Sequence, residues 1–366
     1  MSRTVVVVGG GYGGAGAAKA LDAEADVVLV DSRDAFVNAA ASLRSVAQPD
    51  FAPNMFFPFD ALLERGRFVR GRVVSADPEG VTLDTGERLG ADYIVLATGS
   101  NYAYPAKPNP SVTSAAQAID DLRVTHKEVL GSERVLILGA GPVGLELGGE
   151  IKEVWPEKHV TIVDPAPELL PGFLPSVRED LQRQLAEKGI EVRLGTSLTA
   201  LPPTGPGRSG SFTVGTTAGD EITADIWFRA FGVQVNSDYL ADGKLVARTE
   251  RGTVAVTEHL RVDGHEHVYA LGDITDLAEA KMAGYAMQHA EIVAQNILAQ
   301  IRGEQPAGTY APAPDPMILL PLGPTGGVGQ LPMPDGTTGV GPDTVSQYKG
   351  TDLFTGKFLG MFGKTV

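Results

Sequence analysis

The sequence predicts an α/β fold with two similar domains, each built on a parallel sheet. The first observation is a repeated pattern, in which a four-residue apolar strand, a glycine-rich turn, a helical stretch and a second apolar strand follow one another. This pattern occupies residues 5–30 and returns at residues 135–163. The second observation is the length, because 366 residues correspond to two or three domains at roughly 150 residues each.

Composition excludes several classes of protein. The chain has no cysteine, which removes disulfide frameworks, thiolate metal sites, cysteine nucleophiles and dithiol relays. A net charge of −15 repels nucleic-acid phosphate, so no nucleic-acid partner is expected. No apolar run reaches the roughly 18 residues of a membrane-spanning helix, and Ser2 stands where a myristoylation signal needs glycine. We therefore expect a cytoplasmic protein without a metal site.

The first glycine-rich turn has the spacing of a dinucleotide-binding fingerprint, Gly9-x-Gly11-x-x-Gly14. It follows the strand 5–8 and opens an Ala- and Gly-rich helix, whose N-terminal N–H groups favour a pyrophosphate. Asp31 ends the second strand, where an acidic residue binds ribose hydroxyls. Strand, turn, helix and acid together predict a Rossmann-like nucleotide site.

The second turn, Gly139-x-Gly141-x-x-Gly144, repeats this arrangement after the strand 135–138, and Asp164 ends its second strand. A carboxylate there favours NADH over NADPH, because it binds two free ribose hydroxyls and repels a 2′-phosphate. Two fingerprints imply two dinucleotides, most simply a flavin and a nicotinamide.

Three further segments resemble motifs of a known family. Residues 94–99 are similar to the motif that closes a flavin domain, residues 268–273 to a late flavin-binding motif, and residues 230–232 to a return crossing. Together they resemble the two-dinucleotide-domain flavoprotein reductases, specifically their apoptosis-inducing-factor-like branch. Finer similarity to that branch lies in residues 31–44, 144–152, 155–158, 170–178, 281–283, 327–330 and 349–354.

The resemblance implies a flavin domain that is split by an inserted nicotinamide domain. The expected FAD-binding domain comprises residues 1–105 and 233–305, the NAD(P)H-binding domain residues 106–232, and a small C-terminal α+β domain residues 306–366. The family member compared differs from this sequence in two respects. It carries an N-terminal lipidation signal and lacks an acid at the position of Asp164.

The resemblance also assigns residues to the two cofactors. FAD would be held by Gly9, Gly11, Gly13, Gly14, Asp31, Arg44, Val74, Ala97, Thr98, Gly99, Gly272, Asp273, Lys281 and Met282. NADH, or less favourably NADPH, would be held by Gly139, Gly141, Gly144, Glu146, Asp164 and Gly232.

Three of the implied residues would act at the reacting atoms: Glu146 near the nicotinamide carboxamide, Lys281 at the pyrimidine edge of the flavin, and Lys349 above the flavin. Glu146 and Lys281, and also Arg44 among the flavin-binding residues, have structural alternatives. Glu146 could be a helix N-terminal carboxylate and Lys281 a solvated loop residue. Arg44 could form a surface ion pair instead of approaching the flavin phosphates.

The sequence accordingly predicts an FAD-dependent oxidoreductase that passes hydride from NADH through the flavin to a quinone-type acceptor. Without cysteines, electrons must pass from flavin to acceptor directly. Alternatives are a ferredoxin-type reductase, a tailoring oxidoreductase on a quinone-like metabolite, and a slow-turnover NADH-sensing flavoprotein. A homodimer is also left open.

The C-terminal segment differs from the acidic average. At helical spacing, Phe354, Phe358, Met361 and Phe362 share one face, with Lys349, Lys357 and Lys364 roughly opposite. Such a face can lie on a membrane surface or pack on the protein body, and both alternatives remain open.

Overall fold

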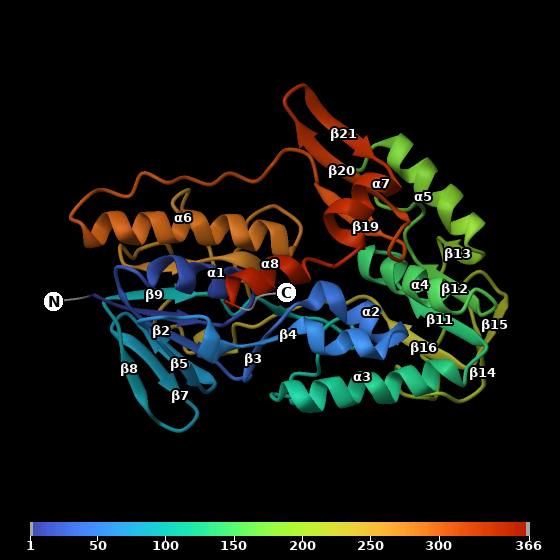
Figure 1. The fold of residues 1–366 in the computed structure, drawn as a ribbon, viewed down its shortest axis with the longest axis horizontal. Helices are drawn as coiled ribbons and strands as arrows, with labels where there is room; N and C mark the ends of the chain where they lie inside the picture. The colour runs from blue at the N-terminus through green and yellow to red at the C-terminus, as the bar shows by residue number, and fades with distance from the viewer. Residues whose placement is uncertain (1–2, 364–366) are drawn as a thin grey trace.

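A computed structural model describes residues 3–363 and contains two parallel sheets at opposite ends of an elongated molecule (Figure 1). The predicted α/β class is confirmed. Ser2 and Lys364, which entered the expectations on lipidation and on the basic tail, lie outside the described residues.

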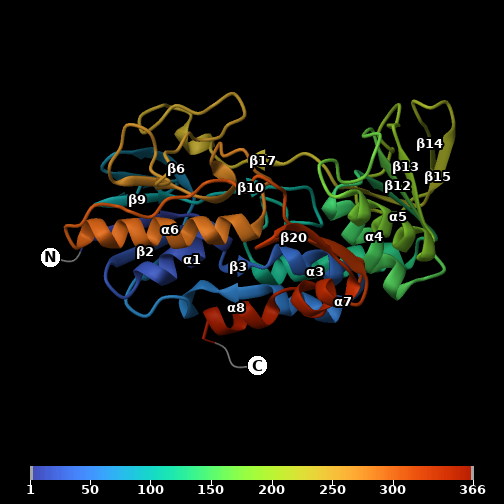
Figure 2. The same cartoon turned by 90° about the horizontal axis from the view of Figure 1, so that it is seen from above.

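The first sheet has the order β18-β9-β1-β2-β5, with all strands parallel. Its strands are β1 (Thr4–Val8), β2 (Asp26–Asp31), β5 (Arg67–Arg70), β9 (Tyr93–Leu96) and β18 (Val268–Ala270). Helices α1 (Tyr12–Leu21) and α6 (Ala283–Ile301) pack together on one face (Figure 2). The other face is covered by an antiparallel meander of β6 (Val73–Asp77), β7 (Gly80–Leu83) and β8 (Arg88–Gly90).

The segment 68–74, whose sequence predicts a single short strand, contributes instead to two strands, β5 and β6. Strand β5 pairs with β2 in the parallel sheet. Directly after β5, the N–H of Gly71 donates to Asp31 O, and the backbone then turns into β6. The parallel sheet and the meander therefore share no strand, because the turn at Gly71 separates them.

The second sheet has the order β13-β12-β11-β16, again parallel. It is formed by β11 (Arg134–Leu138), β12 (His159–Asp164), β13 (Ile190–Leu194) and β16 (Ile226–Arg229). Helices α3 (Ala115–Leu130), α4 (Pro142–Val154) and α5 (Pro175–Glu187) contribute to one hydrophobic core. The hairpin of β14 (Phe212–Gly215) and β15 (Glu221–Ala224) packs on Leu136, Leu138 and Trp227.

The connection between the sheets is a short antiparallel pair, β10 (Ser100–Asn101) with β17 (Gln234–Val235). The chain leaves the first sheet after β9, forms the second, and returns to add β18 beside β9. The second unit is thus inserted into the first, as the resemblance implies. The residue bounds given above for the domains stay predictions.

The C-terminal region begins with an extended segment, residues 302–317, that runs back along α6 (Figure 2). It continues into the antiparallel strands β19 (Ile318–Pro321), β20 (Gly327–Met333) and β21 (Gly336–Val340). These contact α4 and α5. Then follow α7 (Pro342–Val345), one π-helical turn (Ser346–Gly350) and α8 (Thr355–Met361). Short elements complete the fold: β3 (Ala35–Val37), β4 (Phe56–Pro58), α2 (Ser42–Ala47) and 3-10 turns at Ala39–Ala41, Pro49–Met55, Phe59–Ala61, Asp238–Leu240 and Gly272–Ile274.

Helix α8 packs its aromatic residues on the protein body. Phe358 and Phe362 are buried, and Phe358 lies 4.7 Å from Phe36 and 5.5 Å from Tyr12 between ring centroids. Of the two alternatives for this segment, packing therefore accounts for the two buried aromatics. Among residues 3–363, no helix has the length and apolar character needed to cross a membrane.

Candidate functional site: two dinucleotide cradles and their junction

The first glycine-rich turn is closed by backbone contacts that no larger residue permits. Gly9 has φ of +102°, and a Cβ there would lie 2.5 Å from Ala97 O. A Cβ on Gly14 would lie 1.8 Å from Gly9 O, so this glycine brings α1 onto the turn. Gly11 is different, because it is the N-cap of α1 and a Cβ there would meet nothing within 4 Å. Open space therefore adjoins the uncapped N–H groups of the helix, as a bound pyrophosphate requires.

The second turn repeats this construction closely. Gly139 has φ of +113°, and a Cβ there would lie 2.6 Å from Ala230 O. A Cβ on Gly144 would lie 2.0 Å from Gly139 O, whereas a Cβ on Gly141 would again meet nothing within 4 Å. Gly141 is the uncapped N-cap of α4. Both cradles thus have the shape and donor set of a dinucleotide site.

Each cradle also has its carboxylate in the same place. Asp31 accepts the N–H of Gly10 at 2.7 Å and that of Arg33 at 2.8 Å. Asp164 accepts the N–H of Ala140 and that of Ala166, both at 2.7 Å. Burial raises the pKa of the Asp31 carboxyl, although the backbone donors oppose that shift. Both carboxylates lie beside the turn where a ribose would bind.

The two motifs of the flavin resemblance lie together at the end of the first sheet. Thr98 donates to Asn236 O at 2.6 Å, and Ser100 donates to the carboxylate of Asp273. The side chain of Lys107 donates to Ser100 O at 2.6 Å. Burial lowers the pKa of the Lys107 ammonium, and Asp273 opposes this.

Ser100, Lys107 and Asn236 were not predicted from the sequence. They belong to connecting segments between the sheets, which have no strand or helix periodicity. A lone lysine in the Pro-containing segment 104–110 gives no recognisable pattern. The pairing of β10 with β17 brings Asn236 to Thr98, and the Ser100 side chain reaches Asp273.

Lys281 and Met282 lie at the start of α6. Lys281 donates to Thr275 O at 2.7 Å, and burial lowers the pKa of its ammonium. Met282 is the N-cap of α6, which has no side-chain cap. Lys281 is thus tied to the loop that carries Asp273.

Glu146 and Lys349 form an ion pair of 2.8 Å, although they are far apart in the sequence. Their side chains are 10% and 15% exposed, and Lys349 also donates to Leu319 O at 3.0 Å. Burial raises the pKa of the Glu146 carboxyl, and the Lys349 charge opposes this. The π-helical turn of the C-terminal region thereby contacts the second fingerprint helix.

The surroundings of Arg44 correct one alternative drawn from the sequence, the surface ion pair, whereas its approach to the flavin phosphates stays a prediction. It forms an ion pair of 2.8 Å with Glu150, but both side chains are only 3% exposed, so the pair is buried rather than at the surface. Arg44 also donates to Gly350 O at 2.6 Å and to Thr351 O at 3.0 Å. Its guanidinium donors are therefore directed to α4 and the C-terminal region.

The structure also defines the surroundings of three further predicted residues, Gly13, Gly232 and Val74. A Cβ on Gly13 would lie 2.7 Å from Ala286 O, so Gly13 permits the close approach of α1 and α6. Gly232 has φ of +88°, beside the Arg229 guanidinium. Val74 is 48% exposed on the meander strand β6 and belongs to neither glycine-rich turn.

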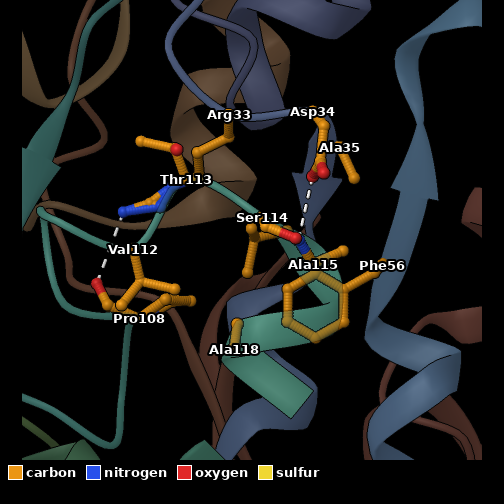
Figure 3. A pocket seen from close by; sticks show the side chains of 11 residues that line it. Arg33, Asp34, Ala35, Phe56, Pro108, Val112, Thr113, Ser114, Ala115 and Ala118 are labelled. Carbon is orange, nitrogen blue, oxygen red and sulfur yellow. Dashed lines mark hydrogen bonds between the residues drawn. The ribbon is translucent and has the colours of Figure 1, made fainter. Parts of the chain in front are cut away.

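A small hollow lies between Arg33 and Asp34, which follow β2, and the start of α3 (Figure 3). Asp34 there accepts the N–H of Ala115 at 2.9 Å, and Arg33 donates to Pro108 O at 3.3 Å. Burial lowers the pKa of the Arg33 guanidinium, and the charge of nearby Asp31 opposes this. Among residues 3–363, the Nη1 of Arg33 has no hydrogen-bond partner.

Comparison with known proteins agrees with this geometry. The sequence profile described as "Pyridine nucleotide-disulphide oxidoreductase" matches residues 3–295. Ferroptosis suppressor protein 1 of Taeniopygia guttata is 35% identical over 100% of this chain and 97% of that protein. The Homo sapiens protein of the same name is 34% identical over 89% of this chain and 88% of that protein. Apoptosis-inducing factor homolog B of Dictyostelium discoideum is 29% identical over 98% of this chain and 96% of that protein.

Solved structures show the same fold. The sulfide:quinone oxidoreductase of Aquifex aeolicus superposes with a TM-score of 0.78 at 19% identity, covering 99% of this chain and 91% of that one. The water-forming NADH oxidase of Lactobacillus brevis superposes with a TM-score of 0.65 at 19% identity, covering 84% of this chain and 71% of that one.

The fold and the two cradles define a flavin- and pyridine-nucleotide-dependent oxidoreductase. The chain belongs to the pyridine nucleotide-disulphide oxidoreductase family, in the branch that includes ferroptosis suppressor protein 1 and the apoptosis-inducing factor homologues. It differs from the family's name in one respect, because it has no cysteine and hence no redox disulfide.

The two kinds of glycine in a cradle predict opposite defects. Gly141→Ala should leave the free energy of unfolding within about 0.5 kcal/mol of the wild type, because its Cβ meets no protein atom, while raising the NADH dissociation constant about 10-fold. Gly144→Ala should destabilise the protein by about 1–3 kcal/mol, because its Cβ meets a backbone oxygen. Urea unfolding and NADH titration measure both effects. Unchanged NADH affinity in Gly141→Ala would contradict the assignment of this turn.

Proposed function

We propose that this protein is an NADH:quinone oxidoreductase in which FAD carries the electrons from NADH to the quinone. The observation that carries the proposal is the combination of two dinucleotide cradles with the complete absence of cysteine. Dithiol relays need two thiols, so electrons leave the flavin directly for the acceptor. The similarity to ferroptosis suppressor proteins supports a quinone as that acceptor.

FAD, when bound, supplies the redox chemistry: it accepts hydride from NADH and returns two electrons to the quinone, which takes up two protons to become the quinol. The residues of the first cradle, with Ala97, Thr98, Gly99, Gly272 and Asp273, would hold it. The chain itself contributes binding, orientation and exclusion of water.

Glu146 is assigned the role of orienting the nicotinamide. It lies on the second turn of α4, five residues after Gly141, and so belongs to the NADH cradle. A buried carboxylate accepts an amide N–H well only while it is ionised, and burial opposes ionisation. The Lys349 ammonium, 2.8 Å from Oε1, opposes this shift in pKa and so favours the charged form of Glu146.

Lys281 and the N-terminus of α6 are assigned to the pyrimidine edge of the flavin. A helix N-terminus without a side-chain cap carries partial positive charge, which would stabilise negative charge on a bound flavin ring. The cytoplasmic location stays a prediction. Lipid-surface contact through Phe358 and Phe362 is not part of the proposal, because both rings are buried against the protein body. A homodimer stays a prediction.

Anaerobic stopped-flow mixing with NADH should bleach the visible flavin band, and a second mixing with a short-chain ubiquinone should restore it at a rate that supports turnover. An unchanged spectrum on the first mixing would contradict the proposal. Fast reoxidation by ferredoxin but not by quinones would favour the ferredoxin-type reductase. Slow reoxidation by every acceptor would favour the NADH sensor.

The Glu146–Lys349 pair can be tested with shape-conserving changes. Glu146→Gln should slow flavin reduction by NADH about 10-fold or more at unchanged flavin content, because the amide lacks the charge that orients the carboxamide. Lys349→Met should slow the same step, since it leaves Glu146 buried without its counter-charge. Glu153→Gln is the control. Glu153 lies on α4, as Glu146 does, but its ion pair is with Lys188 at the end of α5 and is more exposed, so the rate should stay unchanged. Equal rates in all variants would remove Glu146 from the site.

The coenzyme preference rests on Asp164. Asp164→Asn keeps a side-chain oxygen for the Ala140 N–H but removes the charge that repels a 2′-phosphate. The ratio of kcat/KM for NADPH to that for NADH should therefore rise about 10-fold, which corresponds to about 1.4 kcal/mol. The matching change in the other cradle, Asp31→Asn, should leave this ratio unchanged. A wild-type enzyme that already prefers NADPH would contradict the assignment.

A further inference from the structure

A buried polar cluster behind the late flavin motif has no part in the mechanism above. It consists of His289 on α6, Glu279 in the loop before α6, and Tyr310 in the extended segment 302–317. The side chains of His289 and Glu279 are 1% and 6% exposed. The segment that carries Tyr310 runs along α6 (Figure 2). Three separate parts of the chain therefore meet here, with His289 and Glu279 buried and Tyr310 partly exposed.

The hydrogen bonds of the cluster fix the state of the imidazole. The backbone N–H of Gly272 donates to Nδ1 of His289 at 3.0 Å, so Nδ1 must be the unprotonated nitrogen. The other nitrogen, Nε2, then carries the proton and lies 2.9 Å from Oε1 of Glu279. That contact is close, but the ring is not aligned for a linear hydrogen bond, so it orients the imidazole mainly by charge.

Tyr310 completes the environment of the carboxylate. Its hydroxyl donates to Oε2 of Glu279 at 2.6 Å, and its ring lies edge-on to the His289 ring at 4.2 Å between centroids. Burial raises the pKa of the Tyr310 phenol, and Glu279 raises it further, so the phenol remains a donor. Glu279 and Tyr310 thus hold the imidazole in one tautomer and one orientation.

The residue at the end of this chain of contacts is Gly272, which directly precedes Asp273. Gly272 is buried and has φ of +69°. Its carbonyl accepts the Thr275 hydroxyl at 2.9 Å, and the Thr275 carbonyl accepts Lys281 Nζ at 2.7 Å. Without Nδ1 of His289, the Gly272 N–H would be a buried donor with no partner, and the turn that presents Asp273 and Lys281 would relax to satisfy it.

We propose that His289 is a positioning residue for the flavin site, held in place by Glu279 and Tyr310. It acts through Gly272 on the geometry of Asp273, and it contacts neither substrate nor the reacting atoms. The inference rests on FAD being bound by the first cradle. Its test uses FAD affinity rather than quinone reduction, so a wrong acceptor would leave it intact.

The experiment is the FAD dissociation constant of the holoenzyme, measured by equilibrium dialysis, together with the flavin absorption spectrum and the thermal midpoint. His289→Ala should raise this constant about 10-fold or more and shift the flavin band. His289→Asn should restore affinity to within about 3-fold of the wild type, because the amide oxygen can accept the Gly272 N–H. Tyr310→Phe should give an intermediate loss of affinity.

His259→Ala is the matched control. His259 also binds the extended segment, through a 2.8 Å contact with Gly308 O, but it does not contact Gly272. The substitution His259→Ala should lower the thermal midpoint of the protein without changing its affinity for FAD. Equal loss of FAD affinity in His289→Ala and His259→Ala would reduce the cluster to structural packing and overturn the proposal. Should His289→Ala fail to fold, unchanged affinity in Tyr310→Phe together with loss of affinity in His289→Asn would overturn it.

Discussion

The ion pair between Arg44 and Glu150 connects three parts of the molecule that the chain makes separately. Arg44 belongs to the first dinucleotide unit, Glu150 to the second fingerprint helix, and the carbonyls of Gly350 and Thr351 to the C-terminal region. Because neither charge reaches solvent, losing either partner would leave the other buried and uncompensated, at a cost of about 3–5 kcal/mol. The relative placement of the two cradles depends on this junction.

Glu146 stands four residues before Glu150 on α4, so the two carboxylates project from the same side of the helix. One carboxylate binds Arg44 and the other binds Lys349, on either side of the same π-helical turn. The contact that holds the C-terminal region in place therefore lies one helical turn from the carboxylate assigned to the nicotinamide. Both ion pairs use a single face of α4, which is how Lys349, distant in the sequence, comes into contact with Glu146.

The sequence predicted the parts of the site that local geometry dictates. Gly9, Gly14, Gly139 and Gly144 follow from the spacing of the fingerprint. The oxygens that exclude a Cβ at Gly14 and Gly144 lie five residues earlier in the same turn, whereas those at Gly9 and Gly139 belong to Ala97 and Ala230, which follow neighbouring strands. Asp31 and Asp164 follow because each ends the strand next to its turn. Arg44 was placed less well: a single arginine on a short helix gives no sign of its partner, and its partner lies in the inserted unit.

By itself, then, the amino-acid sequence determined the two cradles, the α/β class and the absence of a thiol relay, because these depend on residue type and short-range spacing. The tertiary structure alone decided the pairing of Glu146 with Lys349, the burial of Arg44, the packing of Phe358 and the cluster around His289. The physical reason is that burial and long-range pairing set the charge state of a side chain, and both arise only when distant segments meet.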